Sequence, residues 1–81
     1  MRETAIPIDE IYIPAKLRGS LDPNKVETVA EGILSEGDHE AISVRQGNGR
    51  YVLVRGIHRL EAMKALGESE IKAILVAARQ F

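Results

Sequence analysis

Val54-Arg55-Gly56-Ile57-His58-Arg59-Leu60-Glu61-Ala62 is the stretch that decides the fold of this chain. It joins the end of an apolar strand to a helix that continues to Leu66, and the glycine between them lets the backbone turn. The first N–H groups of a helix have no partner within the helix, and the helix dipole adds partial positive charge there. His58 and Arg59 lie in this first turn and add donors and positive charge. The turn is therefore predicted to bind an anion, in particular a nucleotide phosphate.

An ordinary strand-to-helix turn is the alternative interpretation. Gly56 would then only permit the bend, and His58 and Arg59 would be solvated residues of the first helical turn. Cations at this end of a helix oppose its dipole by about 0.3–1 kcal/mol each. Two of them without an acid at the cap are anomalous, and a bound anion would remove the anomaly. The residues alone leave both interpretations open.

The composition narrows the class of protein. With 81 residues, 44% of them hydrophobic, the chain is predicted to form one domain over residues 1–81. The absence of cysteine excludes disulfides, thiolate metal sites and cysteine nucleophiles. A formal net charge of −1 and only three aromatic residues give no basis for strong DNA binding by the domain itself or for a base-stacking platform. Because no signal pattern and no apolar run of membrane-spanning length is present, the cytoplasm is the expected compartment and no membrane partner is expected.

Apolar patterning and turn residues predict the other elements. The helix that precedes the hairpin begins at Pro23, with Asp22 as its N-cap, and ends near Gly37. Its apolar stripe consists of Val26, Val29, Ala30, Ile33 and Leu34. The remaining expected elements are strands over 4–8 and 11–13, an exposed loop over 15–20, a hairpin of 41–46 and 50–54 closed by three residues that supply positive φ values, and a strand over 71–76. This order predicts an α+β fold, a small sheet with helices packed against it.

Several polar residues are candidates for a site. Lys25 and Thr28 lie on one side of the first helix, off its apolar stripe, and would line a cleft or simply form a solvated face; the residues alone favour the solvated face. Arg18, in the expected loop, poses the same choice between a lid over phosphates and a solvated side chain.

Metal and catalytic motifs are weak in this sequence. His39 lies between acidic residues, but His58 is the only other histidine, so a polar loop is preferred over a metal site. Three glutamates are general-base candidates without further support: Glu27, Glu31 and Glu61.

Segments along nearly the whole chain, from about residue 5 to 77, resemble the ParB/sulfiredoxin superfamily. Leu21-Asp22-Pro23-Asn24-Lys25-Val26 matches the Leu-Asp-Pro-x-Lys-Val helix start of sulfiredoxins. Gly56-Ile57-His58-Arg59 matches their Gly-Cys-His-Arg turn, which binds ATP phosphates, and the Gly-Glu-Arg-Arg turn with which ParB domains bind CTP. The other matching segments are residues 6–11, 42–45, 51–56, 58–62 and 67–74.

The resemblance implies a small α+β fold that holds a nucleoside triphosphate, ATP or CTP, with Mg²⁺ bridging the phosphates. Gly56, Ile57, His58 and Arg59 would hold the phosphates. Lys25 and Thr28 match positions that contact the nucleotide in sulfiredoxins, which reverses the preference for a solvated face. Arg18 matches an arginine that ParB-type domains carry before this helix.

Two departures from the family patterns limit these expectations. Ile57 stands where sulfiredoxins have their cysteine, which excludes sulfiredoxin activity, and where ParB domains have an acidic residue. Glu61 replaces a ParB arginine, so CTP preference and hydrolysis do not follow from the resemblance. The resulting hypothesis is a stand-alone, ParB-like nucleotide-binding module linked to DNA partition or transcription, with at most weak NTPase activity. Its partners would be a protein, DNA through a complex, or a second copy in a homodimer. The alternative is an ATP-dependent phosphotransferase or nuclease-like enzyme of the same fold.

Overall fold

The computed structural model describes residues 2–37 and 40–77 of the chain. Its elements are, in order, β1 (Glu3–Pro7), the 3₁₀ helix η1 (Ile8–Glu10), β2 (Ile11–Tyr12), α1 (Ala15–Arg18), α2 (Pro23–Glu36), β3 (Ile42–Gln46), β4 (Tyr51–Arg55), α3 (Ile57–Ala65) and β5 (Glu70–Leu75). The predicted α+β class, a small sheet with helices against it, is confirmed. No helix in the described ranges is long and apolar enough to cross a membrane.

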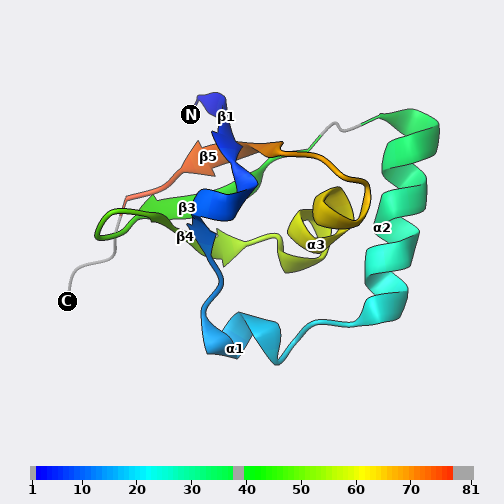
Figure 1. Ribbon diagram of the computed structural model, residues 1–81, viewed down its shortest axis with the longest axis horizontal. Coiled ribbons are helices and arrows are strands. Elements are labelled where there is room, and N and C mark those ends of the chain that lie inside the picture. Colours follow the sequence, from blue (N-terminus) through cyan, green and yellow to red (C-terminus); the bar gives the residue numbers. More distant parts are fainter. Residues whose placement is uncertain (1, 38–39, 78–81) are drawn as a thin grey trace.

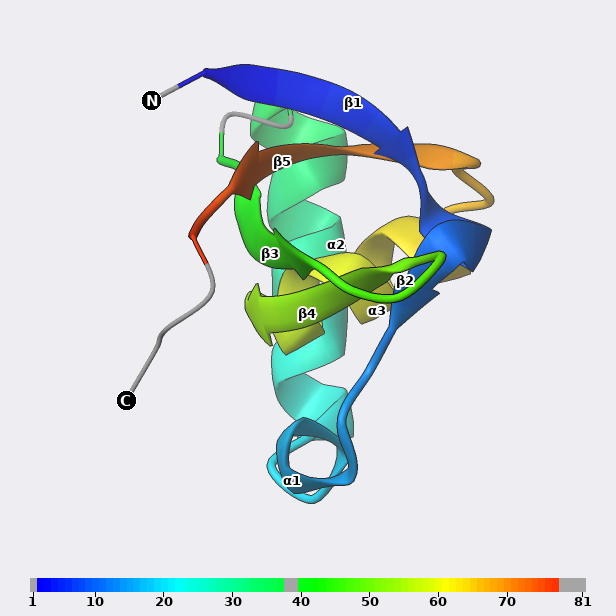
Figure 2. The ribbon, with the colours of Figure 1, turned by 90° about the vertical axis from the view of Figure 1, so that its left-hand side faces the viewer.

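The five strands form one mixed sheet in the order β1-β5-β3-β4-β2. The central hairpin pairs β3 with β4 in antiparallel fashion, and β5 joins β3 in parallel after the chain has passed through α3. β1 then pairs with β5 antiparallel, and the short β2 pairs with β4 in parallel. The sheet is strongly curled (Figure 2).

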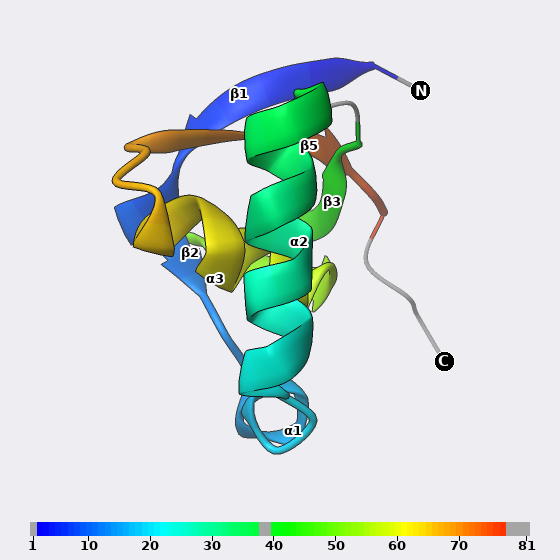
Figure 3. The same ribbon diagram turned by 90° about the vertical axis from the view of Figure 1, so that its right-hand side faces the viewer.

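The sheet, α3 and α2 form three successive layers (Figure 1). Helix α3 lies against the sheet and contributes Ile57, Leu60, Ala62 and Met63 to the buried residues. The sheet side of the core consists chiefly of Ile6, Ile42, Val44, Leu53, Ile71 and Ala73. Helix α2 packs on the outside of α3, and none of its residues is fully buried (Figure 3).

Helix α2 begins and ends where the capping residues predict. The Asp22 carboxylate accepts a hydrogen bond of 2.9 Å from the Asn24 N–H, and Gly37 ends the helix with a φ of 89°. The apolar stripe is half-buried except at Leu34, which is 74% exposed, so its assignment to the packed stripe is wrong. The C-terminal end of α2 extends past α3 (Figure 3), and Leu34 is one of the last three residues of this helix.

The predicted exposed loop over residues 15–20 is wrong in its first part, which forms the single turn α1. The N–H groups of Leu17 and Arg18 donate to the Pro14 carbonyl at 3.0 and 3.1 Å. Leu17 packs against the core cluster, and this contact stabilises a turn that four residues could not form alone.

The hairpin turn at residues 47–49 is also built differently from the prediction. Only Gly49 of the three has a positive φ, 76°. At Gly47 the requirement is space, because a Cβ atom there would lie 2.8 Å from Val52 Cγ2. The glycine lets the two strands approach closely at this point.

Candidate functional site

The turn at Gly56 leads directly from the end of β4 into the start of α3. Gly56 is the N-cap of α3 and is left-handed, with φ 111° and ψ 32°. A Cβ atom at this position would lie 2.6 Å from Ile42 Cγ2, so the turn presses directly on β3. The β3–β4 register is irregular between Ser43 and Val44, beside this turn. The first turn of α3 is therefore held in one place by the sheet.

The N-terminal end of α3 carries no acidic counter-charge of its own. No side chain caps the helix and its first turn contains no acidic residue. The first backbone hydrogen bond of the helix runs from the Leu60 N–H to the Gly56 carbonyl at 2.9 Å. The positive end of the helix dipole thus faces outward without a carboxylate cap.

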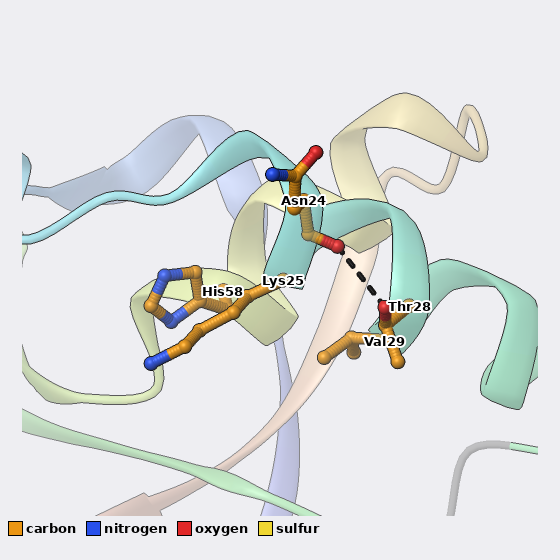
Figure 4. Close-up of a pocket in the computed structure, with 5 residues that line it drawn as sticks. All are labelled: Asn24, Lys25, Thr28, Val29 and His58. Carbon is orange, nitrogen blue, oxygen red and sulfur yellow. Dashed lines mark hydrogen bonds between the residues drawn. The ribbon is translucent and has the colours of Figure 1, made fainter.

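A hollow of about 290 Å³ lies between the first half of α2 and the start of α3. Its lining residues are Asn24, Lys25, Thr28, Val29 and His58. The Lys25 and His58 side chains lie side by side in this hollow, and Thr28 Oγ1 donates to the Asn24 carbonyl at 3.1 Å (Figure 4). Lys25 and Thr28 border the hollow from α2, and His58 borders it from α3.

A second hollow, of about 350 Å³, adjoins the first and shares Val29 with it. It is lined by Val29, Glu40, Ala41, Ile42, Arg55, Gly56 and Arg59. The Arg59 side chain is 18% exposed, and its Nη2 lies 4.0 Å from Oε2 of Glu40, whose side chain is 79% exposed. The two hollows together cross the start of α3, with basic groups in both.

The His58 side chain, expected to be a phosphate donor, makes a hydrogen bond within the chain as an acceptor. Its Nε2 accepts a hydrogen bond of 3.0 Å from the Asp22 N–H, 36 residues away in sequence. An imidazole nitrogen that accepts a hydrogen bond carries no proton, so Nδ1 is the protonated nitrogen in this arrangement. His58 therefore joins the starts of the two helices that flank the site.

The structure brings five of the seven predicted site residues to the two hollows. Lys25, Thr28 and His58 line the first, and Gly56 and Arg59 line the second. Ile57 is 6% exposed with its side chain in the core, so only its backbone could reach a ligand. Arg18 is exposed on α1 and lines neither hollow.

Sequence reasoning missed three polar residues that line the hollows: Asn24, Glu40 and Arg55. Arg55 could have been found, because it ends the strand immediately before Gly56. Glu40 comes to the site only through the fold, and no local pattern marks it.

The candidate general bases lie outside both hollows. Glu27 and Glu31 are exposed, and the Glu61 carboxylate pairs with Lys64 at 3.2 Å. The described part of the chain contains no group of three or more histidine, cysteine, aspartate or glutamate side chains that could hold a metal ion. His39 lies outside the described residues.

Comparison with known sequences matches nearly the whole chain to one family. The ParB N-terminal domain family matches residues 2–80. The chain is 35% identical over 75 residues to a probable chromosome-partitioning protein ParB of Campylobacter jejuni, covering 91% of this chain and 27% of that protein. It is 35% identical over 72 residues to a nucleoid occlusion protein of Halalkalibacterium halodurans, covering 86% and 25%. The chain thus spans about a quarter of the length of these relatives.

Solved structures share the fold. Sulfiredoxin from Arabidopsis thaliana superposes with a TM-score of 0.83 at 28% identity, covering 96% of this chain and 88% of that one. The truncated ParB of Caulobacter crescentus, complexed with CTP-gamma-S, has a TM-score of 0.80 at 20% identity, covering 99% and 47%. A free serine kinase in complex with AMP has a TM-score of 0.76 at 18% identity, covering 91% and 30%. The last two likenesses concern the fold alone.

Proposed function

This chain belongs to the ParB N-terminal domain family, and from that premise we propose that it binds a nucleoside triphosphate, CTP or ATP, across the start of α3. The observation that carries the proposal is an α3 N-terminus without an acidic cap, flanked on both sides by basic groups. Helix N-termini of this kind bind phosphate through backbone N–H groups and the helix dipole. Two proteins of this fold hold CTP-gamma-S and AMP, which supports a nucleotide as the ligand.

The triphosphate is assigned to the second hollow, where Gly56, Ile57 and His58 would supply backbone groups and Arg59 a guanidinium. The base and ribose are assigned to the first hollow, against Lys25 and Thr28. Arg18 would reach the phosphates by a movement of α1, which is a single exposed turn.

Mg²⁺ would accompany the phosphates. This ion is commonly bound by one or two carboxylates together with substrate phosphates. Glu40 is the carboxylate that lines the second hollow, and it is 79% exposed and able to turn toward a bound ion. In that arrangement the chain would supply one ligand and the nucleotide the others.

Arg59 is the side chain expected to contribute most to affinity. It is largely buried beside the turn, so its guanidinium is held in place before a ligand arrives. A hydrogen bond to a charged group contributes about 1.5–3 kcal/mol, which corresponds to roughly 10- to 100-fold in affinity.

Isothermal titration calorimetry with CTP, ATP, GTP and ADP in the presence of Mg²⁺ tests the proposal. We expect heat of binding for at least one triphosphate, and a loss of about tenfold or more in affinity for Arg59→Ala. Arg45→Ala is the control, because Arg45 is exposed on β3 and lines neither hollow. No heat at millimolar ligand for any of the four nucleotides, or equal losses in the two variants, would overturn the assignment.

The family supports a proposal for the role of the bound nucleotide. The matching relatives are named as chromosome-partitioning and nucleoid occlusion proteins, so we place this chain in a partition-linked or transcription-linked regulatory system. With a formal net charge of −1, it would reach DNA through a protein complex rather than by strong binding of its own, and a second copy in a homodimer is its other candidate partner. Sedimentation with and without nucleotide distinguishes a dimer from a monomer that needs another protein.

A further inference from the structure

We propose that His58 is a proton-sensitive clasp that holds the N-terminal end of α2, and that an anion bound at the start of α3 opens it. The second half of this inference rests on the proposed function. The clasp is the 3.0 Å hydrogen bond from the Asp22 N–H to His58 Nε2, which joins the first turns of α2 and α3.

This bond adds a hydrogen bond between the starts of α2 and α3 to the packing of half-buried side chains that holds α2. None of its residues is fully buried, and within the described part of the chain Ile33 is the α2 side chain that packs against the core cluster. Ile33 lies in the C-terminal half of the helix. The N-terminal half packs on α3 through half-buried side chains alone and is tied to it by the His58 hydrogen bond. Loss of that bond would let this half move while Ile33 keeps the other end in place.

The clasp can exist only while the imidazole is neutral. A doubly protonated ring has no lone pair, so its Nε2 would face the Asp22 N–H as a second donor and the bond would break. Histidine is the side chain whose charge changes between about pH 5 and pH 8. The bond therefore has two states, closed with a neutral ring and open with a charged ring.

The charges around His58 determine how a ligand acts on it. Lys25 lines the same hollow as His58 (Figure 4), and Arg59 is the next residue of α3. The Asp22 carboxylate caps the Asn24 N–H at 2.9 Å. A phosphate at the start of α3 would add negative charge beside the ring and beside Arg59. Binding of the anion is therefore expected to favour the charged, open state.

Opening would also change the far side of α2. Its first turn separates the nucleotide hollow from a third hollow of about 460 Å³, lined by Leu21, Pro23, Val26, Glu61, Lys64 and Ala65. Because one side of that hollow is formed by α2 and the other by α3, movement of the α2 start would change its width. A ligand in the nucleotide hollow, on one side of the α2 start, would thus alter the shape of the third hollow on the other side.

Amide hydrogen exchange of the whole chain tests the first half of the proposal without any ligand. Between about pH 8 and pH 5.5, the protection factor of the Asp22 amide should fall about three- to tenfold, the factor that corresponds to one ordinary hydrogen bond. The Leu60 amide, bonded to the Gly56 carbonyl, is the internal reference and should keep its protection. His58→Gln retains an acceptor but takes up no proton in this range, so its Asp22 protection should stay constant. Protection of Asp22 that does not change in the wild type overturns the clasp.

Calorimetry with inorganic tripolyphosphate, in two buffers of different ionisation enthalpy, tests the coupling to an anion. We expect the wild type to take up a fraction of a proton on binding and His58→Gln to take up less. Binding with equal proton uptake in both proteins overturns the coupling and leaves the proposed function standing. Absence of binding contradicts the proposed function, while the exchange experiment still decides whether the clasp exists.

Discussion

Two requirements meet at Gly56, a left-handed φ of 111° and a Cβ position 2.6 Å from Ile42 Cγ2. A left-handed backbone costs an L-residue about 1–2 kcal/mol, and overpacking of a core position costs about 1–3 kcal/mol. Gly56→Ala should therefore lower the free energy of unfolding by about 2–5 kcal/mol. Urea denaturation followed by circular dichroism measures this change.

Gly67 provides the matched comparison for that prediction. Its φ is 80°, and an added Cβ would meet nothing within 4 Å. Gly67→Ala should lower the free energy of unfolding only by the cost of the left-handed backbone, about 1–2 kcal/mol. Equal losses at the two positions would mean that the contact with Ile42 does not restrain the turn.

At the residue scale, the sequence predicted the positions that depend on neighbours in the chain. Gly56 and the His58-Arg59 pair follow from one continuous strand-turn-helix pattern. Lys25 became a candidate only through the resemblance at the helix start, since its spacing alone favoured a solvated face. The hydrogen bond between Asp22 and His58 could not be predicted, because it joins residues 36 apart whose contact depends on how α2 packs on α3. Glu40 reaches Arg59 in the same way, through the sheet.

At the scale of elements, the Asp22 cap should determine how well α2 forms. Removal of an N-cap side chain costs about 0.5–2 kcal/mol, and the helix has little burial to compensate the loss. Asp22→Ala should therefore lower the free energy of unfolding by about 1 kcal/mol, measured by urea denaturation. Asp22→Asn keeps an oxygen acceptor for the Asn24 N–H and should stay close to the wild type. The backbone bond to His58 is present in both variants, so a large loss in Asp22→Asn would contradict the capping explanation.

Patterns predicted elements well where local chemistry decides them and poorly where packing decides them. The start of α2 follows from Asp22 and Pro23, and its end from Gly37. The turn α1 was missed because Leu17 stabilises it through the core, which no local pattern reports. Leu34 continues the helical period but is exposed near the C-terminal end of α2, so periodicity assigned it to a contact that the fold does not provide.

At the scale of the molecule, the layers differ in burial: the sheet and α3 contain the buried core, and α2 has no fully buried residue. The sheet and α3 share the core cluster, whereas α2 forms the outer layer of a molecule with extents of 40 × 27 × 19 Å. The candidate nucleotide site lies between these two parts, since its first hollow has residues from α2 and α3. A ligand there would bridge the outer helix to the core, and it would act on the stability of the whole chain.

A bound nucleotide should therefore raise the melting temperature. A ligand present at about 100 times its dissociation constant stabilises the folded state by about 2.7 kcal/mol. For a chain of this size that corresponds to a rise of about 10–20 °C, measured by thermal denaturation with CTP or ATP and Mg²⁺. At the same nucleotide concentration, Arg59→Ala should show a clearly smaller rise, because its dissociation constant is higher. Arg45→Ala should match the wild type, because its side chain lies on β3 away from both hollows. An equal rise in all three proteins would place the nucleotide elsewhere on the molecule, since occupation of the α3 start must depend on Arg59.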